Sequence, residues 1–263
     1  MNAPPVTAWE LAIAACLVLA NAGLSVLFEA GLARTLVVSA FRAIVQLVFV
    51  GFVLNAVFAL RSPWLVGAVL LAMLAIAGFE IQSRQERRLR GAWRYGLGAA
   101  ITLFTTMIVG ALAVGMVRPA PLYDPHVVIP LVGILLGSVM NGVSISLNAF
   151  NGGVVRERQA IEAQLALGAT RSRALKPLRR SALRGGMIPV VNQMSAAGII
   201  TLPGMMSGQI LAGMNPLEAA KYQALVLLLL SGGAALGAFA TVFVATRRIT
   251  DERHRLRLDR LAA

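Results

Sequence analysis

Polar and thioether side chains recur inside segments that are otherwise apolar, and these residues have the types and spacing to act on a solute. Asn141, Ser144 and Asn148 follow i, i+3, i+7 spacing, so a helix would carry them on one face. A second set falls between residues 186 and 213, and it comprises Asn192, Gln193, Met205, Met206 and Gln209. Such groups in an apolar segment either line a wet path for a solute or hydrogen-bond neighbouring helices, and both readings stay open.

Metal binding is the narrower chemical question for the same set. Thioethers suit Cu(I) better than Fe(II). Adjacent helical residues such as Met205 and Met206 point about 100° apart, which makes a poor chelate. The sequence has one cysteine, Cys16, and its two histidines, His126 and His254, are far apart in the chain. We therefore predict no resident metal site and no cofactor bound by this chain.

Glycine and proline interrupt the second polar region. Pro189, Gly198, Pro203, Gly204 and Gly208 would weaken a continuous helix there. Broken backbone inside a membrane is tolerated where it is buried in protein or lines a wet cavity. We predict a helix break that serves as a gate or part of a substrate path. The structural alternative is an interface of small residues, with methionines filling the gaps.

A strongly charged segment separates the two polar regions. From Val155 to Gly185 the chain holds seven Arg, one Lys and two Glu, which cannot lie in hydrocarbon. Its centre, residues 162–169, reads Glu-Ala-Gln-Leu-Ala-Leu-Gly-Ala. We predict a short helix with Glu162 near its N-terminal end, favoured by the helix dipole, and a turn at Gly168. A solvated basic loop is the plainer alternative.

Membrane-spanning helices must position these residues. Hydrophobic residues make up 58% of the 263, charged residues 13%, and the mean hydropathy is +0.77. Soluble domains carry about 25% charged residues, and a run of about 20 apolar residues crosses a bilayer. We predict an all-α integral membrane protein with a single domain, 1–263, and about seven transmembrane helices. The predicted spans are 9–28, 35–60, 64–79, 93–117, 127–150, 186–213 and 219–245.

The net charge of +13 is distributed unevenly between the loops. One set of alternate loops and the C-terminal tail together hold 20 of the 24 Lys and Arg residues. This positive-inside pattern predicts an outside N-terminus, a cytoplasmic C-terminus and a cytoplasmic segment at about 151–185. It also argues against a nucleic-acid partner. We expect the tail, 246–263, to be a polar helix or a disordered end that contacts anionic membrane lipid.

Three stretches carry a resemblance to known transporters. Residues 162–169 resemble the EAA-type coupling motif of ABC-transporter permeases, although the Leu-Pro pair of that motif is missing at its usual place after the Gly. Residues 195–213, together with 133–141 and 146–148, are similar to a family of bacterial iron-export ABC permeases whose plant relatives are linked to aluminium tolerance. The sharpest part is Leu202-Pro-Gly-Met-Met-Ser-Gly-Gln209. The resemblance extends from about Phe41 to Ala245.

The resemblance implies a non-catalytic permease subunit in the bacterial inner membrane, exporting iron or a related metal ion. The coupling contacts it implies are Glu162, Ala163, Leu167, Gly168 and Ala169. The sequence contains no GxxxxGK[ST] phosphate loop, so ATP and Mg would bind a separate cytoplasmic ATPase subunit. The permease itself would be a homodimer. The alternatives are a non-metal substrate such as a nucleotide sugar, a secondary transporter, or a membrane scaffold.

Overall fold

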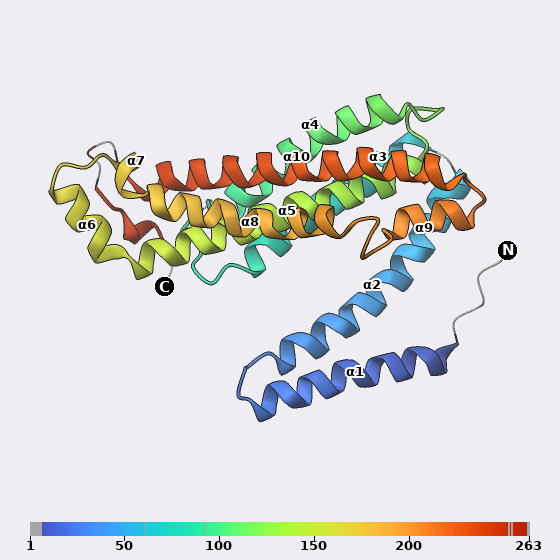
Figure 1. Cartoon of the computed structure of the whole chain (residues 1–263), viewed down its shortest axis with the longest axis horizontal. Helices are drawn as coiled ribbons and strands as arrows, with labels where there is room; N and C mark the ends of the chain where they lie inside the picture. The colour runs from blue at the N-terminus through green and yellow to red at the C-terminus, as the bar shows by residue number, and fades with distance from the viewer. Residues whose placement is uncertain (1–6, 61, 92, 252, 254, 262–263) are drawn as a thin grey trace. The chain divides into compact units, whose positions relative to one another are not determined.

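The computed structural model describes residues 7–60, 62–91, 93–251, 253 and 255–261 (Figure 1). The regular elements of this part are helices. They are α1 (Ala8–Leu27), α2 (Ala33–Leu60), α3 (Pro63–Ser83), α4 (Trp93–Val117), α5 (Pro125–Arg156), α6 (Arg158–Ala166), α7 (Arg171–Ala174), α8 (Lys176–Ala196), α9 (Gly204–Leu211), α10 (Pro216–Ile249) and the 3₁₀ turn η1 (Leu258–Arg260).

Six of the helices in the described part are long and apolar enough to cross a membrane: α1, α2, α3, α4, α5 and α10. This confirms the prediction of an all-α, multi-pass membrane protein. The predicted span 186–213 is divided between α8 and α9. Helix α8 is less apolar because its first half carries Lys176, Arg179, Arg180 and Arg184. The number of crossings and the sides of the two termini therefore stay predictions.

Contacts group the chain into two compact units, residues 1–62 and 63–263, which are described separately. In the first unit, α1 packs against α2. Helix α1 begins at a capping box, in which Thr7 and Glu10 each accept a backbone N–H of the other. The turn after α1 is closed by Ser25, whose Oγ accepts the Leu32 N–H at 2.9 Å. The prediction of a single domain stays a prediction.

Helix α5 is the centre of the second unit. It packs against α3, α4, α8 and α10, and Figure 1 shows α8 and α10 running along it. Helices α5 and α10 begin alike, with Asp124 or Asn215 capping the first turn and a proline at the first helical position. A proline there costs nothing, because its missing N–H would be unpaired anyway.

Glycines let α5 approach both of its main partners closely. A Cβ at Gly142 would lie 2.8 Å from the Ala234 carbonyl oxygen of α10. A Cβ at Gly186 of α8 would lie 2.9 Å from the Gly142 carbonyl oxygen. Real Cβ atoms do not approach backbone this closely, so the three helices touch backbone to backbone at these positions.

The basic loops of the second unit gather at one end, which we call the basic end and define as residues 84–91, 157–175 and 250–261. Leu89 bridges Leu261, and the Arg90 N–H donates to the Arg260 carbonyl at 2.8 Å. Leu89, Leu261 and Ile161 are buried in one apolar cluster. Figure 1 shows α6, α7 and the C-terminus at this end.

The tail therefore differs from both predictions made for it. Helix α10 continues to Ile249, and the described residues beyond it fold back, with the Arg257 N–H donating to the Ile249 carbonyl at 2.8 Å. Leu261 is buried, and Leu256 and Leu258 pack against the same cluster. Three leucines among the arginines supply the apolar surface that holds the tail down, which a reading of charge alone overlooked.

Candidate functional site

The predicted short helix in the charged segment is α6, and its end is where the sequence placed it. The helix ends at Ala166, and Gly168 has a φ of +86°, a left-handed conformation that favours glycine. Its start was predicted wrongly. Helix α6 begins at Arg158, directly after a bend at Glu157 that ends α5, so Glu162 lies in mid-helix. The carboxylate of Glu162 instead pairs with Arg158, Nε to Oε1, at 2.9 Å.

One side of α6 faces the protein and the other is open. Ile161 is buried and Leu165 is half-buried against the apolar cluster of the basic end. Ala163 and Gly168 are exposed, and Leu167 at the end of the helix is 89% exposed. The exposed Leu167 is thus surrounded by small residues, and a partner protein could approach this surface closely. Ala169 is half-buried.

The segment is tied firmly to the helices on both sides of it. Leu175, fully buried, joins α7 to α8, and Leu178 lies against α5, where a Cβ at Gly153 would sit 2.7 Å from Leu178 Cδ2. Arg179 Nη2 donates to the Ser172 carbonyl at 2.8 Å and to Ser172 Oγ at 3.0 Å. Pro177 lies in the first turn of α8, where proline is tolerated.

Two acidic side chains of the tail remain ionised at physiological pH. The Arg257 guanidinium donates to both oxygens of Asp259, at 2.9 and 2.8 Å, and lowers the pKa of that carboxyl to about 2. The Arg255 N–H, at 2.7 Å, lowers the pKa of Asp251. A carboxyl with a lowered pKa keeps its folded-state stabilisation above its unfolded pKa of about 3.9 and loses it only in stronger acid. These two interactions therefore do not change with pH near neutrality.

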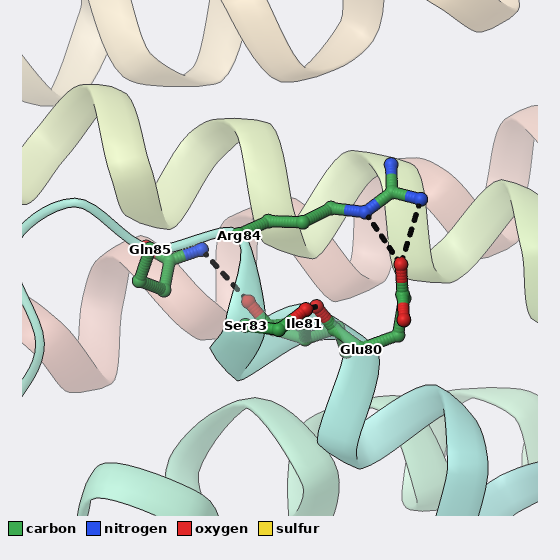
Figure 2. Close-up of polar contacts among 5 residues, drawn as sticks. All are labelled: Glu80, Ile81, Ser83, Arg84 and Gln85. Carbon is green, nitrogen blue, oxygen red and sulfur yellow. Dashed lines mark hydrogen bonds and ion pairs between the residues drawn. The ribbon is translucent and has the colours of Figure 1, made fainter. Parts of the chain in front are cut away.

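The polar stripe predicted on α5 divides into two parts. Its basic-end part holds the loop between α3 and α4: Asn148 Oδ1 accepts the Glu86 N–H at 3.0 Å, and the Ser144 carbonyl accepts Gln85 Nε2 at 3.1 Å. Figure 2 shows the start of this loop, where Arg84 pairs with Glu80 at 3.1 Å. Asn148 thus makes a structural hydrogen bond, although to a loop and not to a neighbouring helix as the alternative reading expected. Its assignment to a path, like that of Ser144, stays a prediction.

The other part of the stripe lines a small pocket between α5, α8 and α10, with a volume of about 140 Å³, and the pocket is open to the surface, since its residues Asn141 and Gln193 are exposed. Asn141 and Ser138 of α5 face it, as does Gln193 of α8. Ser138 Oγ donates to the Leu230 carbonyl of α10 at 3.3 Å. The structure therefore brings together two of the predicted path residues, Asn141 and Gln193, from segments that are far apart in the sequence. Their amides give the pocket both donors and acceptors.

The remaining predicted path residues lie elsewhere. Asn192 is exposed on α8, next to Gln193. Met205 packs against an apolar cluster near Val117 and Tyr222, at the end of the unit opposite the basic end. Met206 and Gln209 are half-buried on α9, and Gln209 Oε1 is enclosed without a hydrogen-bond partner in the described part of the chain. Among the described residues, no group of three or more His, Cys, Asp or Glu is placed to hold a metal ion.

The helix break exists and includes the predicted Gly198 and Pro203, whereas Pro189 lies inside α8. It covers residues 197–203, where Gly198 has a φ of +84° and its N–H donates to the Thr201 carbonyl at 2.9 Å. Pro203 caps α9, in agreement with the prediction. Gly204 is instead the first residue of α9, and Gly208 lies inside it. Those two glycines were wrongly predicted to break the helix, because a glycine only weakens a helix that a preceding proline can start.

Sequence reasoning missed two residues that organise this site. Gly186, at the closest approach of α8 to α5, also lines the pocket. Asn151 is fully buried, and its Nδ2 donates to the Arg87 carbonyl at 3.0 Å. The signal for Asn151 was its position one turn after Asn148, on the same face of the predicted helix. No comparable signal distinguishes Gly186 from the other 24 of the 25 glycines.

Comparison with known proteins adds an independent line of information. The family described as "Uncharacterised protein family (UPF0014)" matches residues 8–250. The "Probable iron export permease protein FetB" of Escherichia coli is 33% identical over 264 residues, which cover 99% of each chain. The "UPF0014 membrane protein slr1647" of Synechocystis is 38% identical over 189 residues, 72% of this chain and 73% of the relative.

A plant relative extends the comparison beyond bacteria. The "Protein ALUMINUM SENSITIVE 3" of Arabidopsis thaliana is 29% identical over 214 residues, 80% of this chain and 75% of the relative. Both α6 and the α8–α9 break lie within the range that the family covers. No solved structure matches the chain significantly.

Proposed function

Because this chain belongs to the UPF0014 family of membrane proteins, we propose that it is the transmembrane permease subunit of an ABC transporter. In this proposal it exports iron or a related metal ion from bacterial cytoplasm across the inner membrane, as a homodimer. The chain itself is not an enzyme. ATP and Mg bind a separate cytoplasmic ATPase subunit, which docks on α6. The printed name of the E. coli relative, an iron export permease, motivates the substrate.

The observation that carries the proposal is the exposed face of α6 on a firmly packed base. Leu167 is 89% exposed between the small residues Ala166 and Gly168, while Ile161 on the opposite side is buried. A helix that transmits force must be rigid on one side and accessible on the other. Helix α6 follows α5 without a loop, and α7 leads directly into α8.

The pocket supports a route from ATP hydrolysis to transport. Its walls come from α5 and α8, the two long helices that flank the coupling segment, and from α10. A displacement of α6 would therefore move Asn141 of α5 relative to Gln193 of α8. Because α5 and α8 are in backbone contact at Gly142 and Gly186, a movement of one helix would be transmitted to the other. Two arrangements of this contact would open the path alternately to each side of the membrane.

A second substrate class is favoured by one feature of α8. Lys176, Arg180 and Arg184 line a groove of about 600 Å³, and the next residues along the helix, Gly186 and Pro189, line the pocket. Three cations beside a path attract anions and repel free metal cations. The alternative is thus an ABC permease for an anionic solute such as a nucleotide sugar. Transport assays in sealed vesicles, with Fe(II) and a nucleotide sugar as competing solutes, separate the two.

A secondary transporter has less support. Ion coupling needs carboxylates inside the membrane. Glu80 pairs with Arg84 at the end of α3 (Figure 2), and Glu29 lies in the turn after α1, so neither is near the middle of a spanning helix. A scaffold that only recruits partners would account for the basic loops but not for a polar pocket between α5 and α8.

The deciding experiment is gentle purification from native membranes, followed by a test for a stoichiometric ATPase subunit. Gly168→Arg places a bulky side chain on the exposed face of α6 and should abolish ATPase retention. Gly91→Arg is the matched control, because Gly91 also has a positive φ, +71°, and open space around it at the basic end. Retention by wild type and Gly91→Arg, with loss in Gly168→Arg, supports the proposal. An ATPase absent from every sample refutes it.

A further inference from the structure

A groove between α8 and α10 has a cationic end that the proposed metal export does not use, although it shares Lys176 and Arg180 with the groove considered for an anionic solute. Its volume is about 360 Å³, and its cations are Lys176, Arg179 and Arg180 in the first turns of α8. None of the described residues that line it is acidic. An anionic group entering this end would therefore meet three positive charges without competition from a carboxylate in the wall.

The rest of the groove is apolar and runs away from the basic end. Leu183 of α8 and Phe239 and Phe243 of α10 form its wall. Phe239 is 58% exposed and Phe243 50% exposed, on a helix apolar enough to cross the membrane. Leu183 lies about 10 Å further along α8 than Lys176, at about 1.5 Å per residue. The groove thus has a charged end and an apolar part that follow one another along α8 and α10.

One of the three cations, Arg179, is held in place, while Lys176 and Arg180 are exposed. Arg179 is anchored by its two hydrogen bonds to Ser172, and its Nε–H is enclosed without an acceptor among the described residues. The guanidinium of Arg247 lies 4.3 Å from the centre of the Phe243 ring and adds a fourth positive charge beside the wall. Such preorganisation lowers the entropy lost on binding a ligand.

We propose that this groove is a binding site for an anionic membrane phospholipid. Its phosphate contacts Lys176, Arg179 and Arg180, and an acyl chain lies along Phe239 and Leu183. Basic pockets between membrane helices at the cytoplasmic side recognise anionic headgroups in this way. A soluble anion would use only the cationic end. A soluble acidic protein cannot reach Phe239, about 15 Å before the end of α10 at Ile249.

The site borders the coupling segment directly, since Lys176 is the first residue of α8 after α7. A lipid in the groove would contact α8 and α10 together and resist a change in their separation. The proposal concerns lipid binding by the permease alone. It stands or falls without regard to the ATPase or the transported solute.

The test is a titration of the purified full-length permease in nanodiscs and by native mass spectrometry. Phosphatidylglycerol is compared with phosphatidylcholine. We expect a preference for phosphatidylglycerol, which the double variant Lys176→Gln, Arg180→Gln weakens about 25-fold, at about fivefold for each cation removed. Arg184→Gln is the matched control: it is exposed on α8 one turn further along, and it does not line the groove. It should change the affinity by less than about twofold.

Equal losses in the Arg180→Gln and Arg184→Gln single variants would show diffuse surface attraction and overturn the proposal. So would equal affinity for the two lipids. Phe239→Ala keeps every cation and shortens the apolar wall, so it should weaken phosphatidylglycerol binding about tenfold. No effect of Phe239→Ala, or displacement of the lipid by millimolar inorganic phosphate, would mean a soluble-anion site instead.

A second copy of the chain is the remaining competitor for the groove. Phe239→Cys in a Cys16→Ala background leaves one thiol, because the sequence has no other cysteine. Failure of this variant to form a disulfide-linked dimer under oxidising conditions in the membrane agrees with lipid occupancy. Rapid crosslinking between the introduced thiols of two copies would show that protein covers the groove and would refute the lipid site.

Discussion

Two adjacent glycines of α8 should respond in opposite ways to the same substitution. At Gly186 a new Cβ would lie 2.9 Å from the Gly142 carbonyl oxygen and would also overlap the Ser146 side chain. At Gly185 the nearest atom to a new Cβ is Ile145 Cγ2 at 3.9 Å, an ordinary contact. Both positions lie inside α8, so both Gly→Ala changes gain about 0.5–1 kcal/mol of helix stability.

The difference between the two variants isolates the packing cost, because the helix gain cancels. Overpacking a close contact costs about 1–3 kcal/mol. Gly185→Ala should therefore be stabilising by up to about 1 kcal/mol. Gly186→Ala should range from nearly neutral to destabilising by about 2 kcal/mol. For a protein of this size, about 1 kcal/mol shifts Tm by about 2–4 °C, so the two Tm values should differ by about 2–12 °C.

The assay is thermal unfolding of the two variants and the wild type in one detergent, at one heating rate, with monodispersity followed by size-exclusion chromatography. Gly186→Ala should have the lower Tm of the two variants. Equal upward shifts in both would refute the reasoning, because they would mean that α5 and α8 are not in backbone contact at Gly142. A reduced transport rate in Gly186→Ala alone would extend the result to the pocket that this residue lines.

Three further predictions concern the basic end. Leu167→Asp should abolish ATPase retention while changing Tm by less than about 2 °C, because the side chain is 89% exposed; a pull-down and a thermal scan check both. Asn151→Ala should destabilise by about 1–3 kcal/mol, measured as Tm, since it removes the fully buried amide that binds the Arg87 carbonyl; no change would mean that water replaces the amide. Leu261→Ala should lose about 2–3 kcal/mol of contact with Leu89, which faster tryptic cleavage of the tail would reveal and an unchanged rate would contradict.

Composition and local pattern were enough to establish the class of the molecule. Long apolar runs and a low charge content indicate a membrane protein. In lipid, only helices and closed barrels satisfy the backbone hydrogen-bonding groups, and runs of about 20 apolar residues are long enough for helices. The turn at Gly168 was predictable for a local reason, since a residue with positive φ favours glycine wherever it stands. The octet from Leu202 to Gln209 identified the family through local identity, without any knowledge of contacts.

Which polar residues meet depended instead on how the helices pack. Asn141 and Asn148 share a helical stripe, yet one faces the pocket beside Gln193 and the other binds the Glu86 N–H. The spacing of polar residues along one helix determines which of them share a face, but it does not determine which neighbouring segment packs against that face. The same limit applies to the tail, whose leucines find Leu89 only because the loop after α3 lies beside α10. Contacts between distant segments depend on packing, and packing is a property of the whole fold.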